Sequence, residues 1–189
     1  MNELNLVEEN YNIWTKLPFD KKTISKVKDL KKNNIEDFND SFYSDLSFGT
    51  GGMRGIVGLG PNRVNKYTFG RNTQGISNFI VKNSNKKVNS VVIAYDCRNQ
   101  SEFLANQVAA IFSANNIKVF LFSSLRPTPE LSYALVKLKC MCGIVLTASH
   151  NPPQYNGYKV YWEDGGQIVP PIDKKLITEI NNTCLLYTS

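Results

Sequence analysis

Three short apolar runs, separated by two helical segments, constrain the fold of this chain more than any other feature of its sequence. The runs cover residues 90–95, 118–122 and 143–146, and the first has the β-branched character of a buried strand. Between them, segments 101–115 and 128–138 repeat apolar residues at helical spacing. The order strand, helix, strand, helix, strand is typical of a parallel sheet with right-handed crossovers. The sequence therefore predicts an α/β fold.

Two helix starts can be placed from their local chemistry. Asn65 can cap a helix that extends to about Asn83. The tripeptide Thr128-Pro129-Glu130 combines a capping hydroxyl, a proline suited to the first turn and an acid near the positive end of a helix. It predicts a helix with Thr128 as its N-cap.

The segment after the third apolar run completes the predicted domain. Residues 158–162 and 167–169, joined through an Asp-Gly-Gly turn, indicate a β-hairpin. Apolar residues at helical spacing then predict a last helix over 172–182. We expect a three-layer α/β/α domain with a mainly parallel sheet over residues 47–183. Residues 184–189 do not continue the helical pattern and are expected to be an artefactual, vector-derived tail.

The amino-terminal part differs in its sequence pattern, because apolar residues recur at helical spacing over residues 3–46. Asp20 can cap one segment, in which Ile24, Val27 and Leu30 form an apolar face. Two or three helices fit this length. We therefore predict a helical amino-terminal extension over residues 1–46.

Lysines in this extension supply much of the net charge of +6. They are Lys21, Lys22, Lys26, Lys28, Lys31 and Lys32. We interpret them as the solvated face of an amphipathic helix. A nucleic-acid site is disfavoured, because neither interleaved aromatic residues nor a recognition motif accompanies the lysines. A positive field that attracts small phosphorylated ligands is compatible with both interpretations.

Composition excludes several classes of protein. With 42% hydrophobic and 20% charged residues, the chain is expected to be globular rather than disordered. It has no run of eighteen apolar residues and no apolar stretch near its start, so we expect no membrane span, no secretory signal and a cytoplasmic location. The four cysteines form no CxxC pair, and a zinc site with the single histidine, His150, is disfavoured.

Polar residues that could take part in binding or catalysis follow each of the three predicted strands. They are Asp96, Arg98 and Ser101 after the first, Arg126 and Thr128 after the second, and Thr147, Ser149, His150 and Asn151 after the third. Because the carboxyl ends of parallel strands meet at one edge of a sheet, we expect all three loops to open on the same edge.

Ser149 is the main candidate for chemistry. It lies in a tight loop between Ala148 and His150, ahead of Pro152-Pro153. A serine in such a loop could be a nucleophile or a carrier of a phosphoryl group, or Thr147 and Ser149 could simply cap a turn. A hydrolase triad is disfavoured, because the only histidine is adjacent to Ser149 in sequence and no GxSxG elbow exists.

Three cations near this edge each allow two interpretations. Arg54, framed by glycines in the loop at residues 48–60, could bind a phosphate through its planar fork or extend into solvent. Lys159 could act as a general acid or base, or be a surface lysine on an exposed strand. Arg98 could pair with Asp96 or contact a ligand.

Four motifs, taken together, resemble those of the α-D-phosphohexomutases. The first is Thr-Ala-Ser-His-Asn-Pro at 147–152 with Asn-Gly-Tyr-Lys at 156–159, and the second is Phe-Gly-Thr-Gly-Gly-Met-Arg-Gly at 48–55. The others are Tyr-Asp-Cys-Arg at 95–98 with Ser101, and Pro-Thr-Pro at 127–129. The long helical leader and Asn-Arg-Val-Asn at 62–65 resemble the phosphoglucomutase/phosphopentomutase branch of that family.

The resemblance implies roles for individual residues. Ser149 would carry the phosphoryl group, Lys159 would transfer protons, Arg54 would lie near the phosphoserine, and His150 would support the loop and contact substrate. The implied contacts to the sugar phosphate are Thr50, Arg54, Arg98, Ser149, His150, Asn151 and Lys159.

The resemblance also implies a reaction and its cofactors. Glucose 1-phosphate and glucose 6-phosphate would interconvert through glucose 1,6-bisphosphate, with Mg²⁺ bound to the phosphate of Ser149. The three-aspartate motif that would complete the metal site is absent from this chain, as are the loops of the other domains. The chain thus resembles the first of four domains, whose partners would be the other three, and we expect it to be inactive alone.

Other functions stay open at this stage. Phosphomannomutase and phosphopentomutase activities use the same chemistry and are distinguished by domains that this chain lacks. A non-catalytic sugar-phosphate-binding module is a further alternative, although Ser149, Lys159 and Arg54 are all intact. Nucleic-acid binding is the weakest alternative, since it would require a steep dependence on salt.

Overall fold

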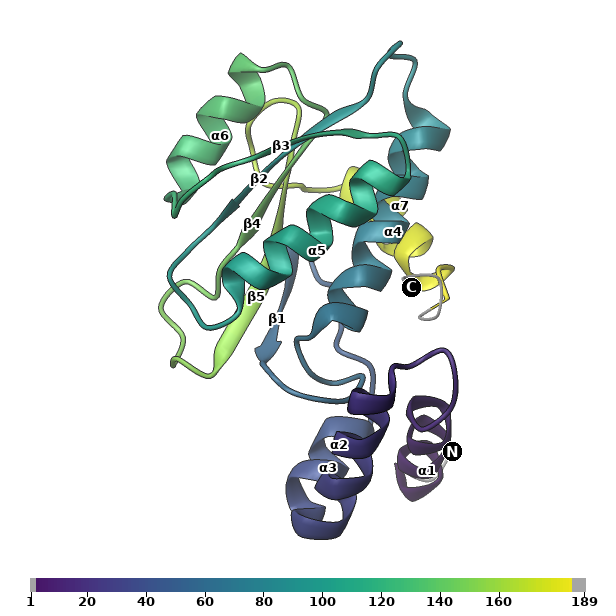
Figure 1. Ribbon diagram of the computed structural model, residues 1–189. Coiled ribbons are helices and arrows are strands. Elements are labelled where there is room, and N and C mark those ends of the chain that lie inside the picture. The colour runs from purple at the N-terminus through teal and green to yellow at the C-terminus, as the bar shows by residue number, and fades with distance from the viewer. Residues whose placement is uncertain (1–2, 185–189) are drawn as a thin grey trace.

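The computed structural model describes residues 3–184 and contains a five-stranded sheet in the order β1-β5-β4-β2-β3 (Figure 1). The strands are β1 (Gly52–Ile56), β2 (Ser90–Tyr95), β3 (Lys118–Leu121), β4 (Cys142–Leu146) and β5 (Tyr155–Trp162). β2 pairs in parallel with both β3 and β4, which confirms the predicted parallel core. β5 pairs antiparallel with β4 and β1, so the complete sheet is mixed.

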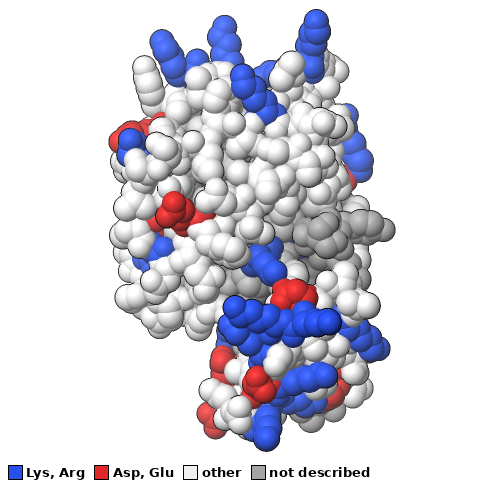
Figure 2. All heavy atoms as spheres, viewed as in Figure 1, with Lys and Arg blue, Asp and Glu red and all other residues white. Residues whose placement is uncertain are grey.

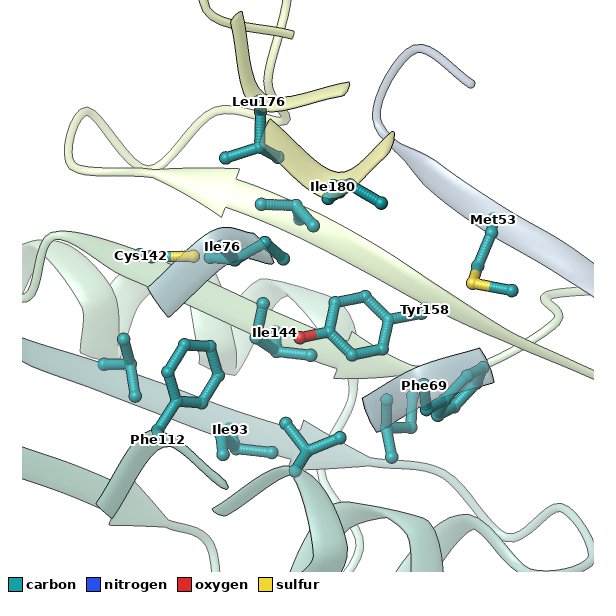
Figure 3. Packing of buried hydrophobic residues seen from close by; sticks show 14 of the residues in the cluster. Met53, Phe69, Ile76, Ile93, Phe112, Cys142, Ile144, Tyr158, Leu176 and Ile180 are labelled. Carbon is teal, nitrogen blue, oxygen red and sulfur yellow. The ribbon is translucent and has the colours of Figure 1, made fainter. Parts of the chain in front are cut away.

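Helices cover both faces of this sheet and form the predicted three layers. They are α4 (Lys66–Asn83), α5 (Ser101–Ala114), α6 (Thr128–Lys137) and α7 (Ile172–Asn181). On one face, α4, α5 and α7 pack against β2, β4 and β5 around residues such as Ile76, Ile144 and Tyr158 (Figure 3). On the other face, Leu131 and Leu135 of α6 pack against β2 and β4.

Two details of the predicted elements are wrong. Thr128 is not the N-cap of α6: Pro127 is, and it provides no side-chain cap. The carbonyl of Pro127 already accepts a bond from the amide of Glu130 at 3.1 Å, so the helix begins one residue earlier. The first arm of the predicted hairpin is part of a longer strand, β5. Its second arm is not a strand and makes only one isolated bridge, between Tyr161 and Gln167.

The strand β1 has no counterpart among the predicted elements, because glycines hide it in the sequence. The cap of α4 is as predicted: the side chain of Asn65 accepts bonds from the amides of Tyr67 and Thr68, and the amide of Asn65 donates to the hydroxyl of Thr68. This capping box fixes the start of α4.

The amino-terminal residues form three helices, α1 (Glu3–Trp14), α2 (Lys21–Asn33) and α3 (Ile35–Phe42). They lie together beyond one end of the sheet (Figure 1) and enclose an aromatic cluster of their own that includes Trp14, Phe38 and Phe42. Trp14 also contacts the ring of Tyr67 on α4, with 5.3 Å between centroids. The boundary between residues 46 and 47 stays a prediction, and of the predicted tail all but Cys184 lies outside the described residues.

Charge on the surface follows the predicted amphipathic pattern. In α2, Thr23 and Val27 are buried, while five of the six lysines are exposed. Figure 2 shows lysine and arginine side chains gathered over the part of the molecule formed by the first three helices. None of the described helices has the length and apolarity needed to cross a bilayer.

The buried cysteines behave as packed thiols. Cys140 and Cys142 lie in the core, and burial raises the pKa of both thiols, so they stay neutral. Burial likewise raises the pKa of Tyr158, whose hydroxyl lies 3.1 Å from that of Thr73. Cys142 and Tyr158 lie on the face covered by α4, α5 and α7, whereas Cys140 packs with residues of α6 on the other face.

Candidate active site

Arg54, Gly157 and Thr147 lie in one row across three neighbouring segments of the sheet. Arg54 on β1 is paired with Gly157 on β5, and the amide of Thr147, just after β4, donates to the carbonyl of Gly157 at 3.0 Å. A Cβ on Gly157 would lie 2.6 Å from the carbonyl oxygen of Thr147 and 2.8 Å from that of Met53. The close approach of the three backbones therefore requires glycine.

Lys159 lies on the same face of the sheet as Arg54. It is paired with Gly52 on β1, two positions along the register from the pair of Arg54 and Gly157. Side chains two residues apart in a strand point to the same face, so the two cations are diagonal neighbours. In the described part of the chain, neither has a carboxylate within ion-pair distance. Two cations without such a partner on one face favour an anionic ligand.

A hollow of about 320 Å³ lies over these cations. Its polar lining consists of Ser47, Thr50, Arg54, Thr147, Lys159 and Gln167, with backbone from the glycine-rich loop. Thr50 donates to the carboxylate of Asp173 at 3.4 Å, which ties this loop to the first turn of α7. Gln167 donates to the carbonyl of Gly51 at 3.1 Å. Hydroxyls, an amide and two cations around one hollow suit a phosphate or a sugar.

Sequence reasoning missed two residues of this lining. Ser47 lies just before the glycine-rich loop, and Gln167 reaches the hollow through its bridge to Tyr161. Neither residue belongs to one of the motifs, and the long-range bond from Gln167 to the carbonyl of Gly51 has no local signal in the sequence. Thr147, interpreted only as a possible turn cap, lines the hollow as well.

Ser149 occupies a left-handed backbone conformation, with φ of 59°. This conformation disfavours a residue with a Cβ by about 1–2 kcal/mol, and such residues gather at functional sites. The hydroxyl of Thr147 accepts the amide of Ser149 at 2.9 Å, which supports the turn. The Ser149 hydroxyl is exposed and lies 3.3 Å from Nδ1 of His150. The segment between β4 and β5, residues 147–154, is called the serine loop below. Thr147 thus belongs to the serine loop and also lines the hollow.

Arg98 holds the serine loop from below. Its terminal nitrogens donate to the carbonyls of Ser149 and Asn151 at 2.7 Å each, and to those of Pro152 and Tyr155 at 3.0 Å each. Its Nε lies 3.5 Å from a carboxylate oxygen of Asp96. A guanidinium has five N–H donors, so every one of them faces an acceptor within the protein. Of the two roles left open from the sequence, the structure favours the one within the protein over a ligand contact.

A second layer of hydrogen bonds supports Asp96. The carboxylate accepts the amide of Arg98 and the hydroxyl of Ser101, both at 3.0 Å. The buried side chain of Asn156 on β5 donates to that same hydroxyl at 2.9 Å and to the carbonyl of Asn99 at 3.1 Å. The loop after β2 is therefore joined to β5 and to the loop after β4.

The remaining candidates are not among the described residues that line the hollow. His150 and Asn151 belong to the serine loop, and the amide oxygen of Asn151 is buried without a hydrogen-bond partner in the described residues. Arg126, after β3, is bonded within its own loop and pairs with Glu130 at 3.1 Å. The three loops therefore do share one edge, but only the third adjoins the hollow.

Magnesium does not fit the residues described here as a resident ion. Among residues 3–184, no three side chains of His, Cys, Asp or Glu gather in a way that could hold a metal. The carboxylate of Asp96, which lies beside Arg98, already contacts Arg98 and Ser101. Mg²⁺ requires several oxygen ligands in octahedral geometry, and residues 3–184 gather no set of side chains that supplies them.

Comparison with known proteins shows the family of this chain. Residues 45–185 match the family model of the phosphoglucomutase/phosphomannomutase, alpha/beta/alpha domain I. The chain belongs to this family. A solved structure of the family, a putative phosphomannomutase from Thermus thermophilus, superposes with a TM-score of 0.67 at 29% identity, over 75% of this chain and 31% of that chain.

Curated members of the family carry different names. A phosphoglucomutase from Staphylococcus haemolyticus is 42% identical over 75% of this chain and 25% of its own length. The human glucose 1,6-bisphosphate synthase and the human phosphopentomutase are both 38% identical, over 87% and 85% of this chain. They are covered over 27% and 28% of their lengths. The chain thus spans little more than a quarter of the curated relatives it matches.

Proposed function

We propose that this chain is the phosphoryl-carrying segment of a phosphohexomutase that interconverts glucose 1-phosphate and glucose 6-phosphate. Ser149 would carry the phosphoryl group, and glucose 1,6-bisphosphate would be the intermediate. The observation that carries the proposal is the exposed Ser149 hydroxyl, held in a left-handed turn beside a hollow that contains the cations Arg54 and Lys159. Membership of the family and the names of the relatives support it.

Phosphoryl transfer would run through Ser149 in two half-reactions. In the first, the bond between phosphorus and Ser149 Oγ breaks and a bond to the free hydroxyl of the sugar monophosphate forms. Lys159 in its neutral form accepts the hydroxyl proton and becomes an ammonium, while Ser149 Oγ keeps the electron pair of the broken bond and takes up a proton from solvent. The bisphosphate then reorients in the site, and its other phosphate is transferred to Ser149 by the reverse steps.

Arg54 and Lys159 would supply the electrostatic part of catalysis. A phosphoserine carries close to two negative charges at neutral pH. The guanidinium of Arg54 can donate to two phosphate oxygens at once, and Lys159, which becomes an ammonium when it takes the proton, lies diagonal to it on the same face. Fixed positive groups of this kind stabilise the charge of a transferring phosphoryl group without reorganising during the reaction.

The choice of sugar is the least constrained part of the proposal. Relatives at equal identity are named a glucose 1,6-bisphosphate synthase and a phosphopentomutase, so similarity does not select among these reactions. All of them would use the same Ser149 chemistry. A non-catalytic sugar-phosphate-binding module is the alternative outside enzymes, and it would bind sugar phosphates without gaining phosphate.

Phosphopeptide mass spectrometry and turnover of the full-length protein would test the proposal. Phosphate is expected on Ser149, and Ser149→Ala should abolish mutase turnover because no carrier remains between the half-reactions. Ser123→Ala is the matched control, since Ser123 is an exposed serine in the loop after β3. Turnover that survives Ser149→Ala, with phosphate found on another residue, would refute the assignment.

A further inference from the structure

Four carbonyl oxygens from one loop converge on the guanidinium of Arg98. They belong to Ser149, Asn151, Pro152 and Tyr155, and their distances to the terminal nitrogens are between 2.7 and 3.0 Å. The side chain is only 12% exposed. This bonding pattern extends over residues 149–155 and uses the four donors of the terminal nitrogens, while Nε lies 3.5 Å from the carboxylate of Asp96.

The same loop contains a non-glycine residue in an unfavourable backbone conformation. Ser149 has a left-handed φ of 59°, and its carbonyl is one of the two that Arg98 binds most closely. A residue in this conformation persists only when its surroundings determine it. Apart from Arg98, the conformation is supported locally by the hydroxyl of Thr147 and by the bond from the Asn151 amide to the Ala148 carbonyl.

We propose that Arg98 is a positioning residue for phosphoryl transfer at Ser149. Its guanidinium keeps the serine loop in one backbone arrangement, in which Ser149 lies two residues from Thr147 in the wall of the hollow, and it does so without touching the sugar phosphate. The proposal rests on the proposed function of Ser149 and adds a residue that acts on the rate rather than on substrate binding.

Arginine is specifically suited to this position. Its planar fork sends parallel donors toward two pairs of carbonyls while Nε faces Asp96. A lysine has the same charge but only three donors on a single nitrogen, so it cannot hold four carbonyls at once. We call the four bonds from Arg98 to these carbonyls the clamp. Arg98→Lys keeps the positive charge at this position but removes the geometry of the clamp.

Steady-state kinetics of the full-length protein provides the first readout. In Arg98→Lys, kcat should fall by about 10²-fold, the loss expected from a displacement of the reacting group by about 1 Å. KM for glucose 1-phosphate should stay near the wild-type value, because no binding group is removed. Arg71→Lys is the matched control: Arg71 also joins a carboxylate, Asp45 at 2.7 Å, to the carbonyl of Thr183 at 3.0 Å, but away from the hollow.

Amide hydrogen exchange on the same variants provides a second readout that does not depend on turnover. Exchange should accelerate within residues 147–157 in Arg98→Lys and should stay unchanged there in Arg71→Lys. In Arg98→Gly, added guanidinium ion at concentrations below those that unfold the protein should restore part of the rate of phosphorylation of Ser149. A role limited to global stability would predict neither the local pattern nor the rescue.

The outcomes separate this inference from the proposed function. A higher KM with kcat unchanged would make Arg98 a binding residue and overturn the inference, and so would wild-type kinetics and exchange in Arg98→Lys. If Arg98→Lys does not fold, Asp96→Asn weakens the hold on Arg98 while keeping the guanidinium, and unchanged kcat and loop exchange in that variant would also overturn it. A wild-type protein with no phosphate on Ser149 would refute the proposed function instead, and the exchange experiment would still report on the clamp.

Discussion

Gly157 lies between the carbonyl oxygens of Met53 on β1 and Thr147 after β4. A methyl group there would approach both oxygens to within 2.8 Å, and both belong to backbone that cannot rotate away. Gly157→Ala should therefore separate the strands, destabilise the protein by about 1–3 kcal/mol and move Arg54 away from Thr147. Urea unfolding of the variant would measure the loss of stability.

Gly166→Ala is the matched control for this substitution. A methyl group at Gly166 would meet only the carboxylate of Asp164, at 3.4 Å and at the end of a flexible side chain. Its effect on stability should be within about 1 kcal/mol of zero. Equal losses for the two alanine variants would show that Gly157 is not the point of closest approach.

At the scale of single residues, the sequence identifies chemistry better than geometry. Ser149, Lys159 and Arg54 can be selected from motifs because their side chains are the ones able to act as nucleophile, base or cation. The sequence does not show that Gly157 lies opposite Arg54, since that depends on strand register. Nor does it show that Arg98 is saturated by carbonyls of a loop more than fifty residues away.

At the scale of elements, α2 is joined to α4 through the cap residue Asp20. Its carboxylate accepts the amide of Thr23 at 2.9 Å, the ammonium of Lys66 at 2.8 Å and the hydroxyl of Tyr67 at 2.6 Å. The ion pair with Lys66, followed by the bond from Tyr67, holds the pKa of Asp20 well below its usual range. The cap thus connects the amino-terminal helices to the α/β domain.

Asp20→Ala should destabilise the protein at neutral pH by about 1 kcal/mol, the usual value of an N-cap, with little more from the exposed ion pair. Because the folded pKa is depressed, the contribution of the charge is present above about pH 4 and is lost as the pH falls through the folded pKa. Asp20→Asn keeps a capping oxygen but no charge, so its difference from wild type should shrink in acid.

Thermal unfolding of these variants between neutral and acidic pH would measure the effect. Asp29→Asn, an exposed carboxylate on the same helix, is the control and should change stability little at either pH. A difference between wild type and Asp20→Asn that grows on acidification would contradict the assigned direction of the pKa shift.

Most elements could be predicted from the sequence, and the exceptions have a physical reason. The helix started by Asn65 and the strands β2, β3 and β4 have strong periodicity or caps. β1 contains Gly52 and Gly55, so it has neither alternation nor a run of β-branched residues to mark it. Its strand conformation is set by pairing with β5 and not by its own residues.

At the scale of the whole molecule, the site faces outward from a sheet that α6 covers only in part. α6 packs on β2 and β4, whereas Arg54 and Lys159 belong to β1 and β5. The hollow over them is therefore lined by one edge of the sheet and by loops. Water weakens electrostatic interactions at such an open site, and a covering domain would strengthen them. The relatives are long enough to supply one.

The isolated chain of 189 residues should bind Mg²⁺ weakly and should not turn over glucose 1-phosphate. Octahedral coordination would need carboxylates that do not gather in the described residues, so the ion would keep most of its water. Calorimetry with Mg²⁺ and a coupled mutase assay would test both statements, with the full-length protein as the control.

The chain should still bind a sugar phosphate weakly through Arg54 and Lys159, and Arg54→Ala should reduce that binding. Saturable, tight binding of Mg²⁺ by these residues alone would mean that the metal site lies within this chain, and steady turnover would mean that the exposed edge already suffices for catalysis.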